Sequence, residues 1–147
     1  MVIEPSSKEP VVIGLLAGEP SGDLLGAGLM TALRAMLQDR EVTFMGVGGA
    51  RMQAAGLICL VDFETLSVNG FREPILRLPQ LYRLYRELST TLVEARIDAF
   101  VGIDFNVFNF ILEARLKRQG IPTAHYVSPS VYAWRRGRTK KVARSAD

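Results

Sequence analysis

The sequence predicts an α/β fold, a Rossmann-like parallel sheet with flanking helices, and three observations support this prediction. Short apolar runs alternate with segments whose apolar residues recur at helical spacing. The connections between successive runs are too long for hairpins, which favours βαβ units and a parallel sheet. The chain has 147 residues, of which 48% are hydrophobic and 22% charged, and this suits one domain with a sizeable core.

Each expected strand is an apolar run of the kind that a strand buried on both faces requires. The first run ends at residues 18–23, a segment with turn chemistry in which Ser21 or Asp23 could cap the following helix. Cys59 falls inside the third run and is expected to be inert core. The five strands are expected at residues 11–17, 42–47, 57–61, 99–103 and 122–127.

Helices are expected where apolar residues return every three or four positions. The longest carries Pro79 near its start, where a missing N–H costs least. Gly120 follows the last one as a C-cap glycine. These helices are expected at residues 24–37, 51–55, 75–96 and 107–119, with another started by the basic tail. Residues 1–10 are expected to form a disordered leader, and residues 11–147 a single domain.

Composition excludes several classes of protein. The sequence has one cysteine and one histidine, which argues against a disulfide framework and against cysteine- or histidine-rich metal sites. Neither a metal nor a cofactor is expected. No apolar run approaches the ~20 residues that span a bilayer. The charged groups Glu4, Lys8 and Glu9 argue against a signal peptide.

Charge is distributed unevenly along the chain. Residues 1–114 hold nine basic and 14 acidic side chains, whereas residues 115–147 hold nine basic and one acidic. A basic end of this kind can bind nucleic acid or an anionic surface. The alternative is the solvated face of a helix. The densest stretch contains Arg135, Arg136, Arg138, Lys140, Lys141 and Arg144.

Candidate site residues follow from the expected sheet, because ligands bind beyond the carboxyl ends of parallel strands. Polar and glycine residues gather at those ends. They are Glu19, Ser21 and Asp23 after the first strand; Gly46, Gly48, Gly49 and Arg51 after the second; Asp104, Asn106 and Asn109 after the fourth; and His125, Tyr126 and Ser128 in or after the fifth.

The first loop is neither G-x-G-x-x-G nor a P-loop, and Glu19 would repel a pyrophosphate. A carboxylate there better suits a sugar hydroxyl. The glycines of residues 46–49 could cradle a phosphate, or they could only make a tight strand-to-helix turn.

Asp104 is the strongest single candidate. It directly follows five apolar residues, so partial desolvation could raise its pKa toward that of a general base for transfer to an alcohol. The alternative is a cap for the next helix. His125 could be a base or a ligand-binding residue, although a core or supporting role is favoured. Ser128 has no elbow motif, which argues against a hydrolase triad.

Several motifs together resemble the lipid-A-disaccharide synthase family. They are residues 17–23 (AGEPSGD) with Gly26, Ala27 and Gly28, residues 48–52 (GGARM), residues 102–104 (GID) and residues 125–135 (HYVSPSVYAWR). The resemblance implies the N-terminal domain of an inverting, two-Rossmann-domain (GT-B type) glycosyltransferase. Such an enzyme joins UDP-2,3-diacylglucosamine to 2,3-diacylglucosamine 1-phosphate, releases UDP, and needs no metal at the transfer step.

The same resemblance assigns roles to residues of this chain. Asp104 matches the carboxylate regarded as the base, and Glu19 matches the acid of the first loop. The other candidates become substrate-binding residues: Ser21, Gly22, Asp23, Gly48, Gly49, Arg51, Asn109, His125 and Ser128. The resemblance also implies a cytoplasmic enzyme, peripheral on the inner face of a Gram-negative inner membrane.

The chain departs from the family pattern at several places. Phe105 and Val107 stand where many members have Ala and a second Asp, so any role of that acid is in doubt. Asn69 and Tyr132 replace a common Met and Trp. The second Rossmann domain, which binds the UDP part of the donor, is expected to be missing. The basic tail is then expected to pack near the cleft between the domains, and no nucleic-acid partner is expected.

Two functional alternatives remain beside this one, a non-catalytic sugar- or nucleotide-binding Rossmann module and a basic-tailed nucleic-acid binder.

A membrane-facing segment is expected at residues 68–86, which combine arginines, tyrosines and large apolar side chains. Phe71, Ile75 and Leu78 are expected to face lipid. The alternative is that the leucines of the segment pack its helix onto the sheet: Leu76, Leu81, Leu84 and Leu88.

Overall fold

The computed structural model describes residues 9–64, 74–104 and 107–127, without the side chains of residues 74–78 and 107. It contains the strands β1 (Val11–Ala17), β2 (Val42–Val47), β3 (Ile58–Cys59), β4 (Ala99–Ile103) and β5 (Thr123–Tyr126). Its helices are α1 (Pro20–Met36), α2 (Ala50–Ala54), α4 (Pro74–Glu94) and α5 (Val107–Arg118). Ser128, Phe71, most of the expected leader and the basic tail lie outside the described residues.

The strands form one parallel sheet in the order β3-β2-β1-β4-β5. The chain builds outward from β1 to β3, then crosses back to β4 on the other side of β1. The order therefore reverses between β1 and β4, and such a switch point is where open α/β sheets bind ligands. The predicted Rossmann-like parallel sheet is confirmed.

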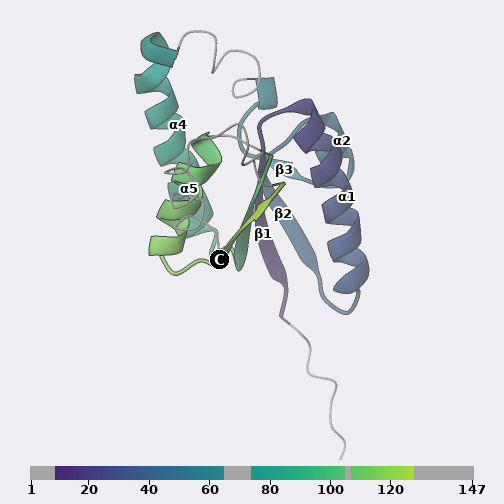
Figure 1. Ribbon diagram of the computed structural model, residues 1–147. Helices are drawn as coiled ribbons and strands as arrows, with labels where there is room; N and C mark the ends of the chain where they lie inside the picture. Colours follow the sequence, from purple (N-terminus) through teal and green to yellow (C-terminus); the bar gives the residue numbers. More distant parts are fainter. Residues whose placement is uncertain (1–8, 65–73, 105–106, 128–147) are drawn as a thin grey trace, which may run out of the picture.

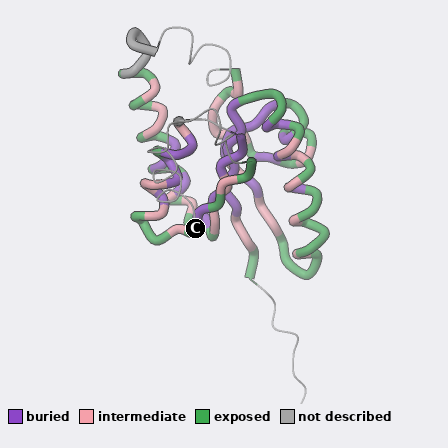
Figure 2. The backbone as a smooth tube through the Cα atoms, in the orientation of Figure 1, coloured by how far each residue is buried: buried purple, intermediate pink, exposed green. Residues whose placement is uncertain are grey.

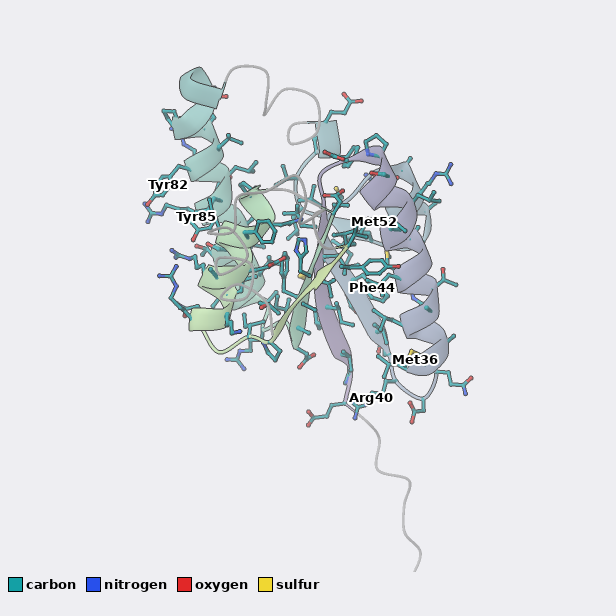
Figure 3. The ribbon with its side chains drawn as sticks, viewed as in Figure 1. Met36, Arg40, Phe44, Met52, Tyr82 and Tyr85 are labelled. Atoms are coloured by element: carbon teal, nitrogen blue, oxygen red, sulfur yellow. The ribbon has the colours of Figure 1, made fainter. Side chains whose placement is uncertain are left out.

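Helices cover both faces of the sheet (Figure 1). On one face, α1 and α2 enclose a core that includes Leu15, Met30, Phe44, Met52 and Ile103. Figure 3 shows Phe44 and Met52 between the sheet and α1. On the other face, α4 and α5 enclose a second core that includes Leu16, Leu88, Leu92, Phe100, Leu112 and Leu116. Buried residues concentrate in the central strands and on the inward sides of the helices (Figure 2).

The strand predictions agree with the structure closely, because continuous apolar runs mark strands buried on both faces. The exception is β3, which pairs with β2 only at Ile58 and Cys59. The C-cap prediction at Gly120 is confirmed: its φ is 82°, and its N–H donates to the Lys117 carbonyl. The N–H of Ile121 donates to the Leu116 carbonyl, which completes a Schellman motif.

The start of α1 differs from the expectation. The helix begins at Pro20, because proline suits the first helical position and Glu19 before it has an extended backbone. Ser21 and Asp23 lie inside the first turn, and Glu19 occupies the N-cap without a side-chain hydrogen bond. The prediction that Ser21 or Asp23 caps this helix is therefore wrong.

Helix α4 packs against the sheet through part of its leucine stripe. Leu88 is buried, and Leu81 and Leu84 pack against the same core, whereas Tyr82 is exposed. Figure 3 shows Tyr82 pointing away from the sheet. Packing by these three leucines is confirmed; the side chains of Ile75, Leu76 and Leu78 are not described. Within the described ranges, every helix is too short or too polar to cross a bilayer.

Candidate active site

The carboxyl ends of β1 and β4 lie side by side at the switch point of the sheet. Ala17 is paired with Ile103, so Glu19 and Asp104 leave the sheet next to each other. Asn109 of α5 ties the two strand ends together, since its side-chain amide donates to the carbonyls of Leu16 (3.3 Å) and Ile103 (3.1 Å). Glu19, Asp104 and Asn109 therefore lie at the same edge of the sheet, as the sequence predicts.

Helix α1 begins directly against Asp104. A Cβ built on Gly22 would lie 1.9 Å from Asp104 Oδ2, so only glycine allows this approach. Asp104 itself has a φ of 63°, which turns its side chain out of the strand direction. Its N–H donates to the Tyr126 carbonyl at 3.0 Å, which holds the turn to the end of β5. The backbone of three elements thus fixes the position of this carboxyl group.

Burial raises the pKa of Asp104 to about 6, and the negative charge of Glu19 adds to the rise. The backbone N–H of Glu19, the charge of His125 and the backbone N–H of Gly18 oppose it. Asp104 is only 6% exposed, and neither of its oxygens makes a full hydrogen bond to a described residue. The N–H groups that act on this carboxylate are those of Gly18 and Glu19, which precede α1, and no described N–H group of α5 is among them, so the geometry does not favour the helix-capping alternative. A carboxylate with this pKa can accept a proton near neutral pH.

Asp23 performs a structural task that the sequence did not reveal. Its two oxygens accept the N–H groups of Arg51 (3.1 Å) and Met52 (3.0 Å), so it caps α2 from a neighbouring helix. A Cβ on Gly49 would lie 2.7 Å from Asp23 Oδ2, which explains the glycine at the N-cap of α2. Both oxygens are already engaged, so a direct role of Asp23 in binding substrate stays a prediction that this placement does not favour.

The glycine turn after β2 is shaped by packing. A Cβ on Gly48 would lie 2.6 Å from Met52 Sδ and 2.8 Å from Leu57 Cδ2. Gly48 and Gly49 are buried, and the Asp23 carboxylate already occupies the start of α2. These contacts favour the tight-turn alternative over a phosphate cradle. Arg51 is exposed just beyond this turn.

His125 lies inside the fold. Its Nδ1 is 2.8 Å from Glu113 Oε1, and its ring stacks on Phe110 with centroids 4.6 Å apart. The sequence reasoning missed Glu113, a fully buried carboxylate on α5. The only sign of this burial in the sequence is that an acidic residue stands among the inward-facing apolar residues of α5, between Leu112 and Leu116. This placement of His125 favours the supporting role over direct contact with a ligand.

The remaining candidates frame the buried centre. Glu19 and Ser21 are exposed at the start of α1, and Asn109 is fully buried beneath the strand ends. Among the residues that the structure describes, no three histidine, cysteine or acidic side chains gather in a way that could hold a metal ion. The arrangement is a buried proton acceptor, Asp104, with a second carboxylate, Glu19, exposed beside it.

Comparisons with known proteins show the family to which the chain belongs. A family model described as lipid-A-disaccharide synthetase matches residues 13–147. The lipid-A-disaccharide synthase of Sodalis glossinidius is 52% identical over 141 residues, 96% of this chain and 36% of the relative. The synthase of Chromobacterium violaceum is 49% identical (95% and 36%), and that of Pasteurella multocida 46% identical (94% and 35%). The chain therefore spans about a third of the length of these curated relatives.

Proposed function

The chain belongs to the lipid-A-disaccharide synthetase family, and from this premise we propose that it forms the acceptor-binding, base-carrying part of a glycosyltransferase of lipid A biosynthesis. The observation that carries the proposal is Asp104, a buried carboxylate at the switch point whose pKa is raised to about 6. A purely binding module needs no such group. The donor is UDP-2,3-diacylglucosamine, and the acceptor is 2,3-diacylglucosamine 1-phosphate.

The chemistry is a single displacement with inversion. The acceptor hydroxyl gives its proton to Asp104 as its oxygen attacks the anomeric carbon of the donor. One carbon–oxygen bond forms, the bond to UDP breaks, and UDP leaves with the electron pair. With a pKa of about 6, Asp104 is ionised at pH 7 to 8 and still basic enough to assist. No metal is needed to move this proton.

Glu19 completes the site from the solvent side. It is exposed, so its carboxylate is free to accept a hydrogen bond from a sugar hydroxyl. It also helps to raise the pKa of Asp104, which makes that group a stronger base. Ser21 follows two residues after Glu19. It is exposed at the same start of α1 and can contact the same sugar.

The membrane surface is the proposed location, since both substrates carry acyl chains. Helix α4 starts at the same end of the sheet as α1, the end where the site lies (Figure 1). Its outward face has a shallow hollow lined by Pro79, Tyr82, Arg83, Arg86, Glu87, Thr90 and Thr91. Tyrosines among arginines suit the headgroup level of a bilayer. A peripheral site on the inner face of the inner membrane, with Phe71, Ile75 and Leu78 toward lipid, is part of this proposal.

The test is Asp104→Asn in the full-length enzyme, with disaccharide formation measured from the two substrates. The amide keeps the shape of the side chain but cannot accept the proton, so kcat should fall by ~100- to 10,000-fold. Glu41→Gln is the matched control, because Glu41 is an exposed carboxylate before β2, at the opposite end of the sheet. A variant that keeps more than about a third of the unmodified kcat would rule out the assigned role.

A further inference from the structure

Asn109 is a polar residue at a position of α5 that faces the core. It is fully buried, as are Leu112 and Leu116, which follow it on the inward side of the same helix. A buried amide without hydrogen bonds costs free energy, and an apolar side chain of similar shape avoids that cost. The reason for an amide at this position therefore lies in the groups that it bonds.

The two hydrogen bonds of the Asn109 amide end on neighbouring strands. Its Nδ2 donates to the Leu16 carbonyl of β1 (3.3 Å) and to the Ile103 carbonyl of β4 (3.1 Å). A hydroxyl has one hydrogen to donate and a carboxylate has none, so neither could serve both carbonyls. Gly102 makes room for the amide, because a Cβ there would lie 3.1 Å from Asn109 Cγ and 1.9 Å from Glu113 Oε1.

The bond to Ile103 fixes the peptide group that precedes Asp104. Asn109 holds the C=O of this group, and the N–H of the same group donates to the Tyr126 carbonyl at 3.0 Å. The peptide is therefore held from α5 on one side and from β5 on the other. Asp104 follows it with a φ of 63°, a left-handed conformation that a residue other than glycine keeps only where its surroundings fix it.

The bond to Leu16 ties that peptide to β1 as well. The chain of β1 leads directly into Glu19 and the first turn of α1, which begins against Asp104 at Gly22. The amide of Asn109 therefore couples the strand that carries the buried carboxylate to the strand that carries the exposed one. Loss of this amide releases both strand ends at once.

We propose that Asn109 is a positioning residue for Asp104: its amide holds the Ile103–Asp104 peptide in the orientation that keeps the carboxylate beside Gly22. This inference rests on the proposed function, in which Asp104 is the base. Direct contact with substrate, the role that the family resemblance implies, does not suit Asn109, because the residue has no exposed surface and both hydrogens of its amide are engaged. Asn109 acts through the backbone and touches no reacting atom.

The first measurement is the steady-state kinetics of Asn109→Leu in the full-length enzyme. Leucine has a similar branched shape but no N–H, so the Ile103–Asp104 peptide loses its bond to α5. A misplacement of about 1 Å can cost roughly 100-fold in rate, so kcat should fall by about 10- to 100-fold while KM for both substrates stays within about threefold. A loss that comes mainly from a raised KM would indicate a substrate-binding residue, and unchanged kinetics would indicate no role. Either result overturns the proposal.

Leu116→Ala is the matched control, since Leu116 is fully buried further along α5 and its apolar side chain can hold neither carbonyl. Urea unfolding compares the two variants, and Leu116→Ala should lose at least as much stability because it leaves a cavity. Its kcat should nevertheless stay within about threefold of the unmodified value. Equal losses of kcat would show that destabilisation alone lowers the rate, and would overturn the proposal. If Asn109→Leu does not fold by circular dichroism, Asn109→Ala replaces it with the same expected kinetics.

The second measurement does not depend on turnover. Crystal structures of the same full-length proteins give the φ of Asp104 and the position of its carboxylate. In Asn109→Leu the carboxylate should move by about 1 Å or more relative to Gly22, whereas Leu116→Ala should leave it in place. An Asp104 that keeps its place and its φ in Asn109→Leu refutes the inference. If the carboxylate moves but Asp104→Asn keeps its activity in the otherwise unmodified enzyme, the proposed function fails while the positioning of Asp104 by Asn109 stands.

Discussion

Asp104 occupies an environment that favours its chemistry at the expense of stability. The ordinary pKa of its carboxyl group is 3.8, and burial with the nearby Glu19 raises it to about 6 in the folded chain. As the pH rises through this window, the unfolded chain gives up the proton first. The folded state then binds more protons than the unfolded state, so the free energy of unfolding falls. A shift of about two units corresponds to about 3 kcal/mol at most.

Asp104→Asn should therefore make the protein more stable at neutral pH. At pH 7.5 the free energy of unfolding should rise by about 1 to 3 kcal/mol, because the amide carries no charge to bury. At pH 4, where the unmodified carboxyl group is protonated in the folded chain, the gain should nearly vanish. Urea unfolding at the two pH values measures the difference. A variant that is less stable at pH 7.5 would contradict the account of Asp104 as a desolvated charge.

At the scale of the element, α1 is placed by its glycines. Gly22 allows its first turn to touch Asp104, and Gly26 allows contact with Met52 of α2, since a Cβ there would lie 2.4 Å from Met52 Sδ. Gly28, on the same helix, has open space around it. Glycine disfavours a helix interior by about 0.5–1 kcal/mol relative to alanine, so Gly22 and Gly26 are explained by close approach.

Gly22→Ala should impair catalysis far more than folding. The new Cβ must displace the Asp104 carboxylate, and a misplacement of about 1 Å can cost roughly 100-fold in rate. Gly28→Ala is the matched control: it should leave kcat unchanged and stabilise the chain by about 0.5–1 kcal/mol. Steady-state kinetics and thermal unfolding of the two full-length variants check this. Equal kinetics in both variants would show that the contact between α1 and Asp104 is unimportant.

The sequence is informative about elements but weaker about their ends. The β1 and β4 runs are continuous and apolar, so their bounds could be predicted. The start of α1 could not, because glycine, proline, serine and aspartate at residues 18–23 are typical of a turn. Here Pro20 begins the helix and Asp23 caps a different one, 28 residues along the chain. A hydrogen bond between distant segments leaves no local pattern in a sequence.

At the scale of the whole molecule, the strand order decides which candidates meet. The sequence predicts that Glu19 and Asp104 each follow a strand, but not that β1 and β4 are neighbours. For the same reason the burial of Glu113 could not be predicted from the sequence, because it depends on Gly102 lying opposite His125 in the sheet. An isolated acid on a helix indicates a solvated face. Only the packed sheet reveals it as a buried partner of histidine.

The position of α4 relative to this site makes the membrane proposal testable with described residues. Arg83 and Arg86 are exposed and line the same hollow as Tyr82, which points away from the sheet (Figure 3). An arginine near an anionic bilayer contributes about 1 kcal/mol of binding free energy, and reversing its charge replaces attraction by repulsion. The double variant Arg83→Glu with Arg86→Glu should therefore bind vesicles containing anionic phospholipid at least about tenfold more weakly.

The matched control is Arg40→Glu with Arg118→Glu, which changes the net charge equally at two exposed positions on other elements. Arg40 lies at the end of the sheet opposite the start of α4 (Figure 3). If α4 faces the membrane, the control should bind like the unmodified enzyme, and circular dichroism should show both variants folded. If net charge alone attracts the protein, the two double variants should lose affinity equally, and the orientation proposed for α4 would be wrong. Added salt should weaken binding of the unmodified enzyme, because headgroup attraction is screened beyond about 10 Å at 0.1 M.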